Sequence, residues 1–165
     1  MNIDEAENIV KPLIPGSTIT KTEDYGDLFA VFFVNDEFFA SKKVEDMMVG
    51  AGPMMVEKST GAVFETGSGQ SAAHYAAAYY ECGSVYGLPS SSIRIFGADA
   101  EKTAIINLKS ALSVGLKEAK KLVLTIQAGE EVVFELDSPS KAAEVVEILK
   151  EHGFSCKQLW SVRGC

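Results

Sequence analysis

Charge is divided unevenly along this chain of 165 residues, and the change coincides with the sequence Gly87-Leu88-Pro89-Ser90-Ser91-Ser92. Residues 1–89 hold 5 Lys and Arg against 13 Asp and Glu, whereas residues 90–165 hold 10 of each kind. Because Gly, Pro and Ser interrupt regular structure, we expect this stretch to be a boundary. The sequence therefore predicts two small domains, 1–89 and 90–165, of which the first carries the whole net charge of −8.

The first domain is predicted to build an antiparallel sheet from two hairpins. Apolar residues recur near the 3.6-residue period before Pro12, which predicts a short helix. Runs of β-branched and aromatic residues then predict the hairpins, and an alanine-rich helix closed by Gly83 follows. The expected order is α-β-β-β-β-α, with a helix at 4–11, strands at 18–23, 28–34, 54–58 and 62–66, and a helix at 70–82.

The second domain is predicted to be an α+β sandwich, with helices on one face of a small antiparallel sheet. Its pattern alternates between β-rich runs and helical runs in the order β-α-α-β-α-β. Gly115 separates the first two helices, and Gly153 caps the third. The expected elements are a strand at 93–96, helices at 101–112 and 116–125, a strand at 131–136, a helix at 139–151 and a strand at 154–160.

Residues suited to catalysis are scarce. The chain has only two histidines, His74 and His152, and each is expected to have a structural role on or beside a helix. Gly67-Ser68-Gly69-Gln70-Ser71 resembles a phosphate-binding loop, but it lacks the Walker lysine and the third glycine of a dinucleotide fingerprint. Adjacent acidic pairs are typical of solvated surface. We therefore predict a protein that is not an enzyme, with no catalytic residues, no cofactor and no metal.

The environment of the chain follows from its termini, cysteines and apolar runs. Cys82, Cys156 and Cys165 have no metal-ligand spacing, and we expect reduced thiols. The longest apolar run, Leu28 to Val34, is too short to span a bilayer, and the acidic start differs from an export signal. We expect a cytoplasmic protein that crosses no membrane. Its negative charge argues against binding nucleic acid and favours a partner protein with a basic surface.

Acidic residues of the first domain alternate with aromatic residues and methionines, which are favoured anchors at interfaces. The carboxylates create a negative field that accelerates the encounter with a basic partner. For Phe38 and Phe39, the alternative is that they pack in the core. The partner-binding residues predicted here are Glu23, Asp24, Tyr25, Asp27, Asp36, Glu37, Phe38, Phe39, Glu45, Asp46, Met47 and Met48.

Residues 49–63, with their Gly-x-Gly-Pro and Thr-Gly features, precede a helix rich in tyrosine. In these features, residues 1–82 resemble the immunity protein 35 (YrhB-like) family. That resemblance implies a bacterial protein that protects its producer by binding the toxin of a polymorphic toxin system. A chaperone-like role is also attributed to relatives.

Residues 92–160 resemble the C-terminal domain of the bacterial ribosomal stalk protein, through the run Gly115 to Val123 and the segment 141–153. The order of elements agrees with that family. The resemblance implies an apolar and basic face that contacts translational GTPases, including elongation factors. The matching positions are Ala104, Ile105, Leu108, Lys109, Leu116 and Lys120.

Together these features predict an immunity protein that occludes the active site or the target-recognition surface of a cognate toxin. A further hypothesis is that the toxin acts on translation, for example as an ADP-ribosyltransferase that modifies an elongation factor. The alternative function is that of a chaperone or protease adaptor that binds unfolded clients.

Overall fold

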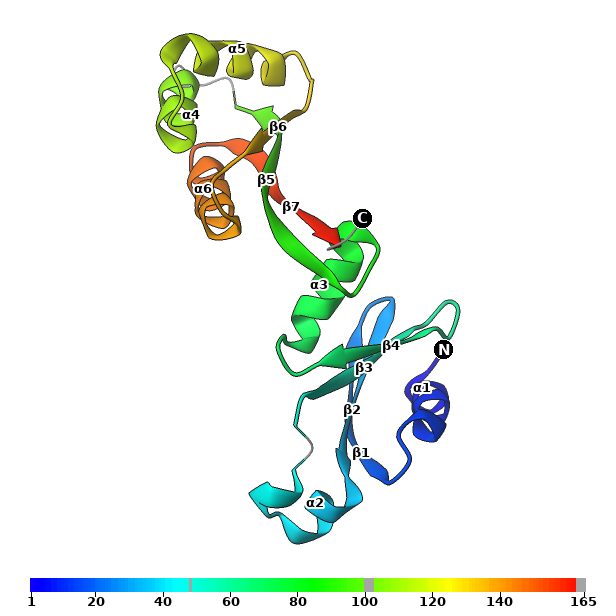
Figure 1. Ribbon diagram of the computed structural model, residues 1–165. Coiled ribbons are helices and arrows are strands. Elements are labelled where there is room, and N and C mark those ends of the chain that lie inside the picture. The colour runs from blue at the N-terminus through cyan, green and yellow to red at the C-terminus, as the bar shows by residue number, and fades with distance from the viewer. Residues whose placement is uncertain (48, 100–102, 163–165) are drawn as a thin grey trace. The chain divides into compact units, whose positions relative to one another are not determined.

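The chain folds into two compact units, Met1–Gly87 and Leu88–Cys165, in the computed structural model, which describes residues 1–47, 49–99 and 103–162 (Figure 1). Each unit combines helices with an antiparallel sheet, which confirms the predicted α+β class. The division between the units falls after Gly87, whereas the sequence placed it after Pro89.

The boundary falls within the expected stretch 87–92, but the regular structure is not interrupted there, because strand β5 (Gly87–Ala98) runs through it. Pairing with a neighbouring strand outweighs the low strand propensity of these residues. The hydroxyl of Ser90 donates to the Leu159 carbonyl over 2.9 Å, and the Gln158 side chain donates to the Ser90 carbonyl over 2.7 Å. Pro89 lies near the start of the strand, where a missing N–H is tolerated.

The sheet of unit 1 contains four strands in the order β1-β2-β3-β4, as two successive antiparallel hairpins. Gly26 and Gly61, with φ of 72° and 77°, make the two tight reversals. Both predicted hairpins are confirmed. The strands are β1 (Ser17–Tyr25), β2 (Leu28–Asn35), β3 (Ala51–Glu57) and β4 (Val63–Gly67).

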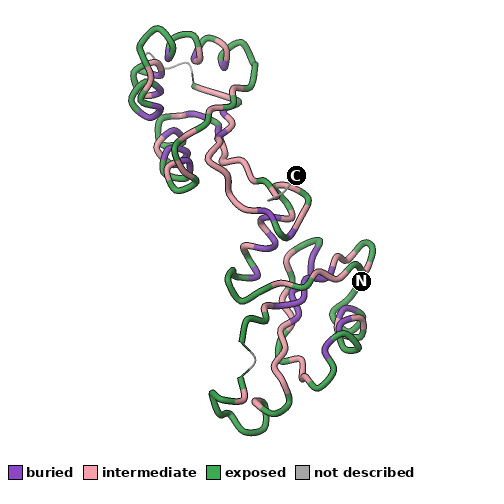
Figure 2. Tube along the Cα trace, in the orientation of Figure 1, coloured by how far each residue is buried: buried purple, intermediate pink, exposed green. Residues whose placement is uncertain are grey.

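Helices cover both faces of this sheet, because its central strands are apolar on both sides. Alternate side chains of β2 and β3 pack against α1 (Ile3–Val10) or against α3 (Ala72–Cys82). Figure 2 colours the buried stretches of these strands purple. The short 3-10 helix η1 (Lys11–Leu13) continues α1. The face under α1 contains Phe29, Val31, Met54 and Val56, and the face under α3 contains Leu28, Ala30 and Met55.

A short helix, α2 (Asp36–Ser41), and a 3-10 turn, η2 (Val44–Asp46), connect β2 to β3 where the sequence predicted a loop. The Asn35 side chain caps α2 by accepting a hydrogen bond from the Phe38 N–H over 3.3 Å. Lys42 ends the helix in the left-handed conformation, with φ of 57°. The predicted element order of the first domain is thus correct except for this segment.

Unit 2 is a three-stranded sheet, in the order β6-β5-β7, with helices packed on one face. The predicted β-α-α-β-α-β order is confirmed. Ile93 and Phe154 of the sheet pack against the helices, whereas Phe96 and Val133 are exposed. Besides β5, the elements are α4 (Ala104–Leu112), α5 (Leu116–Gln127), β6 (Val132–Glu135), α6 (Pro139–Glu151) and β7 (Phe154–Val162). The predicted start of the first helix at residue 101 lies outside the described residues.

Gly52→Ala is expected to destabilise unit 1, because a Cβ at this position would overlap the Gly67 carbonyl and the Thr66 hydroxyl on the paired strand. Overpacking of this kind costs about 1–3 kcal/mol. Gly69→Ala is the matched control, since a Cβ there meets no atom within 4 Å. Urea unfolding of Gly52→Ala and of Gly69→Ala would measure the loss of stability in each. Equal stability of the two variants would contradict the close approach of β3 and β4.

Candidate functional site

The predicted partner-binding residues of unit 1 lie at two opposite ends of the β1–β2 hairpin (Figure 1). Glu23, Asp24, Tyr25 and Asp27 lie at the turn, and the residues from Asp36 onward follow the far end of β2. The 8 residues of β2 separate the two groups by about 25 Å, at about 3.3 Å per residue. The predicted partner-binding residues of unit 1 therefore form two separate groups, and each end is described by itself.

At the turn, the predicted residues bond mainly to one another and to α3. Lys58 Nζ lies 2.6 Å from the Asp24 carboxylate and holds the pKa of that carboxyl below its usual range. Hydrogen bonds from Lys21 and Tyr25 lower the pKa of Glu23 in the same way.

The Tyr80 hydroxyl joins this turn to α3. It donates to the Tyr25 carbonyl over 2.7 Å and accepts from the Asp27 N–H over 2.6 Å. The Tyr25 side chain itself packs against the core under α3. These interactions give the turn residues a part in holding the hairpin to the helix.

A second tyrosine–carboxylate contact stabilises the same end of the sheet. The hydroxyls of Tyr79 and Thr60 both donate to the Glu57 carboxylate, which lowers the pKa of Glu57. The hydrogen bond from Tyr79 to Glu57 raises the pKa of Tyr79 to about 12, because a phenolate would lie against the charged carboxylate. Sequence-based reasoning missed Glu57 as a bonding partner, since it is 22 residues from Tyr79.

At the other end of β2, apolar side chains are exposed beside carboxylates. Phe39, Val44, Met47 and Val49 have 48%, 78%, 46% and 86% of their surface accessible. We define the α2–η2 surface as these four residues with three exposed acidic neighbours, Asp36, Glu37 and Glu45.

The remaining predicted residues of this segment support the surface or lie beside it. Asp46 accepts a hydrogen bond from the Ser41 hydroxyl over 2.5 Å, and its carbonyl accepts one from the Asn35 side chain over 2.6 Å. Phe38 is half-buried, which places it between the two alternatives of anchor and core. Met48 lies outside the described residues.

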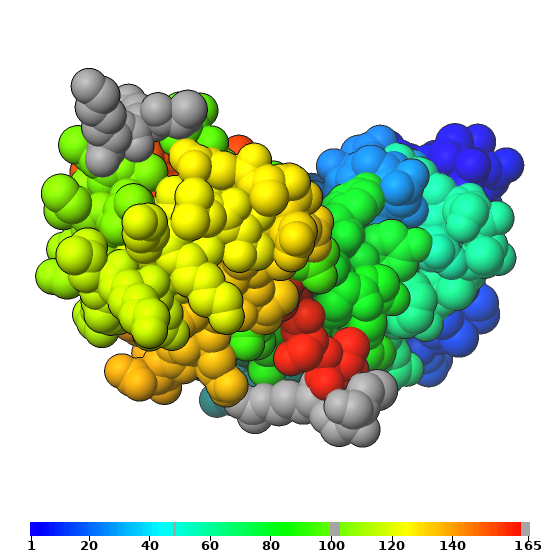
Figure 3. All heavy atoms as spheres, turned by 90° about the horizontal axis from the view of Figure 1, so that it is seen from above, coloured from blue at the N-terminus to red at the C-terminus, as the bar shows by residue number. Residues whose placement is uncertain are grey.

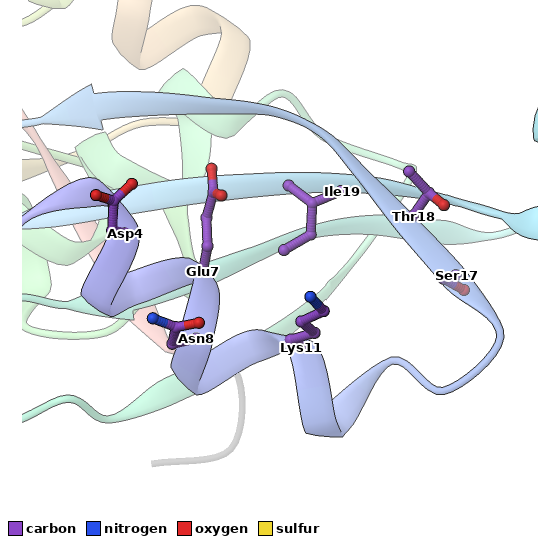
Figure 4. A pocket seen from close by; sticks show the side chains of 7 residues that line it. All are labelled: Asp4, Glu7, Asn8, Lys11, Ser17, Thr18 and Ile19. Atoms are coloured by element: carbon purple, nitrogen blue, oxygen red, sulfur yellow. The ribbon is translucent and has the colours of Figure 1, made fainter.

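Two grooves of unit 1 were not predicted. The first, about 480 Å³, lies between side chains of α1 and η1 on one side and β1 on the other (Figure 4). Its lining is polar: Asp4, Glu7, Asn8, Lys11, Ser17, Thr18 and Ile19. The second, about 440 Å³, has a largely apolar lining that includes Leu13, Ile14, Phe33 and Met54. Each is assembled from separate segments of the chain, which a one-dimensional pattern does not reveal.

In unit 2, two residues predicted to bind a partner are buried. Ala104 and Leu108 pack in the core between the helices and the sheet, so they are not available to a partner. Ile105 is half-buried against the same core. The exposed positions of this face are Lys109, Leu116 and Lys120, and Ile106 and Leu124 are exposed on the same helices, α4 and α5. Figure 3 shows these two helices in yellow-green and yellow.

Neither scans against protein-family models nor comparisons with curated proteins and with solved structures find a match to this chain. The resemblances to immunity protein 35 and to the ribosomal stalk domain therefore stay predictions from sequence motifs.

The side chains that could bind a metal or react chemically are far from one another within the described part of the chain. Over residues 1–47, 49–99 and 103–162, no group of three or more His, Cys, Asp or Glu is placed to hold a metal ion. Cys82 and Cys156 are free thiols, and burial raises the pKa of Cys156. In the glycine-rich loop, Ser71 caps α3 by accepting from the His74 N–H over 3.2 Å. Among the described helices, none is long and apolar enough to cross a membrane.

Glu57→Gln is expected to bring the pKa of Tyr79 from about 12 towards the ordinary value of 10.0, because the neighbouring negative charge is removed. Phenolate absorbance recorded against pH would follow the change, and Tyr79→Phe would identify the transition. An unchanged titration in Glu57→Gln would contradict the assigned cause.

The same contact has a defined effect on stability. Because the folded-state pKa of Tyr79 is raised, its stabilisation is present below pH 10.0 and is lost as pH rises through about 12. Because the pKa of Glu57 is lowered from 4.5, its stabilisation is present above that pH and is lost as pH falls. The unfolding temperatures of the natural chain and of Tyr79→Phe should therefore differ most between pH 4.5 and pH 10.0.

Proposed function

We propose that this chain is a protein without catalytic activity that neutralises a basic toxin protein by binding it through the α2–η2 surface. The observation that carries the proposal is the exposure of Phe39, Val44, Met47 and Val49 in a segment, 36–49, that carries four carboxylates and two lysines, with Lys42 Nζ 4.2 Å from the centre of the Phe39 ring. Contiguous apolar exposure is typical of interaction sites, since burying about 25 cal/mol per Å² of apolar surface against a partner is favourable.

Differences in pairing distinguish the α2–η2 surface from the turn of the hairpin. At the turn, Asp24 and Glu23 are matched by lysines of their own unit. On the α2–η2 surface, Glu45 lies 3.6 Å from Lys43, an exposed pair of small energetic value. Binding can therefore engage Glu45 without breaking bonds that hold the fold, whereas Asp36 also accepts a hydrogen bond from the Thr18 hydroxyl.

Charge supports a basic partner. Residues 1–89 carry the entire net charge of −8, and a field of this sign accelerates association with a positive surface. Enzymes that act on nucleotides or nucleic acids need positive charge in their clefts, because they bind phosphates. A toxin of that type, covered by unit 1, would lose access to its substrate. A toxin that modifies an elongation factor is one specific case of this proposal.

The first test is co-expression of this chain with the product of each adjacent gene, with cell growth as the readout. One of these products is expected to arrest growth alone and to form a stoichiometric complex with this chain. If no adjacent product is toxic or bound, the immunity function is wrong.

Phe39→Ser combined with Val44→Ser is expected to weaken that complex at least about tenfold, since central anchors contribute more than about 1 kcal/mol each. Isothermal titration calorimetry would measure the affinity. The matched control combines Ile3→Ser with Val133→Ser, two apolar residues exposed elsewhere on the chain. An equal loss in both double variants would contradict the assignment of the α2–η2 surface.

Added salt is expected to slow association with the toxin more than it accelerates dissociation, because screening acts on the long-range approach. Stopped-flow or surface-based kinetics at increasing salt concentration would separate the two rates. An association rate that does not depend on salt would exclude electrostatic attraction as the driving force.

A second candidate function, that of a chaperone or protease adaptor, is favoured by one feature of unit 2. Leu116 and Leu124 are exposed on α5 beside Lys120, and such a surface suits unfolded acidic segments. Suppression of the aggregation of a heat-denatured client would support this candidate. Loss of that suppression in Leu116→Ser with Leu124→Ser would assign it to α5.

A further inference from the structure

The largely apolar groove of unit 1 lies on the α1 face of the sheet, where the covering helix ends. Leu13, the last residue of η1, is 50% exposed, and Ile14, the next residue, is buried on this face. Phe33 of β2 and Met54 of β3 belong to the core cluster beneath α1 and line the same groove. We call this cavity of about 440 Å³ the η1–β3 groove.

Small residues keep the groove open. Its wall at the start of β3 is Gly50-Ala51-Gly52, which has almost no side-chain volume. Gly52 is held against the backbone of Gly67, so a larger residue is excluded at that point. With η1 only three residues long, the cover ends near Phe33, which is only partly buried, whereas Met54 beside the groove is buried.

The groove is continuous with the α2–η2 surface. The Asp36 N–H donates to the Gly16 carbonyl over 2.9 Å, and the Thr18 hydroxyl donates to the Asp36 carboxylate over 2.7 Å. These bonds fix the start of α2 beside the turn that follows Leu13 and Ile14. From the other side, the exposed Val49 is next in the chain to Gly50, which lines the groove.

The lining defines the chemistry of an occupant. Its apolar side chains lie among polar groups that include Ser17, Glu65 and Thr66, and the Thr66 hydroxyl is already bonded to the Pro53 carbonyl over 2.5 Å. Glu65 supplies one exposed carboxylate, which has no ion-pair partner among the described residues. An apolar group with positive charge beside it therefore matches the groove, and an anion does not. The volume lies within the roughly 300–1,000 Å³ typical of binding pockets.

We propose that the η1–β3 groove receives an apolar side chain of a basic protein partner, while Glu65 and the α2–η2 carboxylates face lysines or arginines beside that side chain. This inference rests on the proposed function in taking the partner to be a basic protein. It adds a specific anchor point, lined by Leu13 and Met54, to a surface that otherwise offers only exposed side chains.

Three labelled peptides would test the proposal on the full-length protein: one alternating Lys and Leu, one alternating Lys and Ser, and one alternating Glu and Leu. Fluorescence anisotropy gives the affinity, and methyl NMR signals of Leu13, Ile14 and Met54 report the place of binding. Only the Lys–Leu peptide is expected to bind and to shift these signals. Equal binding of either other peptide, or binding that leaves the three signals unchanged, would overturn the proposal.

Filling the groove provides a second test. Ala51→Trp, at an exposed position in the groove wall, is expected to weaken the Lys–Leu peptide at least about tenfold. Ala73→Trp, at an exposed position on α3, is the matched control and is expected to bind normally. Unchanged unfolding midpoints would show that both variants fold, and equal binding by the two would also overturn the proposal.

The outcomes separate this inference from the proposed function. If Ala51→Trp leaves peptide and toxin binding unchanged while Phe39→Ser with Val44→Ser weakens the toxin complex, the groove alone is wrong. If no adjacent gene product binds but the Lys–Leu peptide shifts the signal of Met54, the groove stands and the immunity function falls.

Discussion

The architecture of unit 1 depends on one strand that is apolar on both faces. Leu28 and Ala30 of β2 point to one side, and Phe29 and Val31 to the other, so neither face of the sheet tolerates solvent. Burying each of the larger side chains is worth about 1.5–3 kcal/mol, which requires a helix on each face. The helix α1 has only 8 residues, and its continuation η1 has three. The η1–β3 groove is a direct result of this incomplete cover.

Much of the fold could be predicted because its elements leave local signals. The helices α5 and α6 show a period of 3.6 residues, the hairpins are runs of β-branched and aromatic residues with glycine turns, and α3 is alanine-rich and closed by Gly83. Two segments could not be predicted this way. The helix α2 has only 6 residues and depends on the Asn35 cap and the left-handed Lys42. The start of β5 is held by β7, whose contact with Ser90 is 69 residues away.

The candidate site was predicted less completely, because adjacency in sequence is not adjacency in space. Composition indicated both acidic ends of the β1–β2 hairpin, but only the fold shows that β2 separates them. A helical period likewise places Leu108 on an apolar face without saying whether that face is core or surface, and the structure shows core. The η1–β3 groove escapes every linear pattern, since η1, β2, β3 and β4 each supply part of its lining.

The two acidic ends of unit 1 show how a fold divides its charges between stability and recognition. Carboxylates that meet internal donors, such as Asp24 with Lys58 and Glu57 with Tyr79, hold strands and helix together. On the α2–η2 surface, Glu45 makes only an exposed pair with Lys43 and adds little to the fold, yet it is next in the chain to Val44, one of the most exposed apolar residues. There the negative charge has two effects at once. It opposes association between copies of the chain through an apolar patch, and it attracts a partner of opposite sign that can cover the same patch.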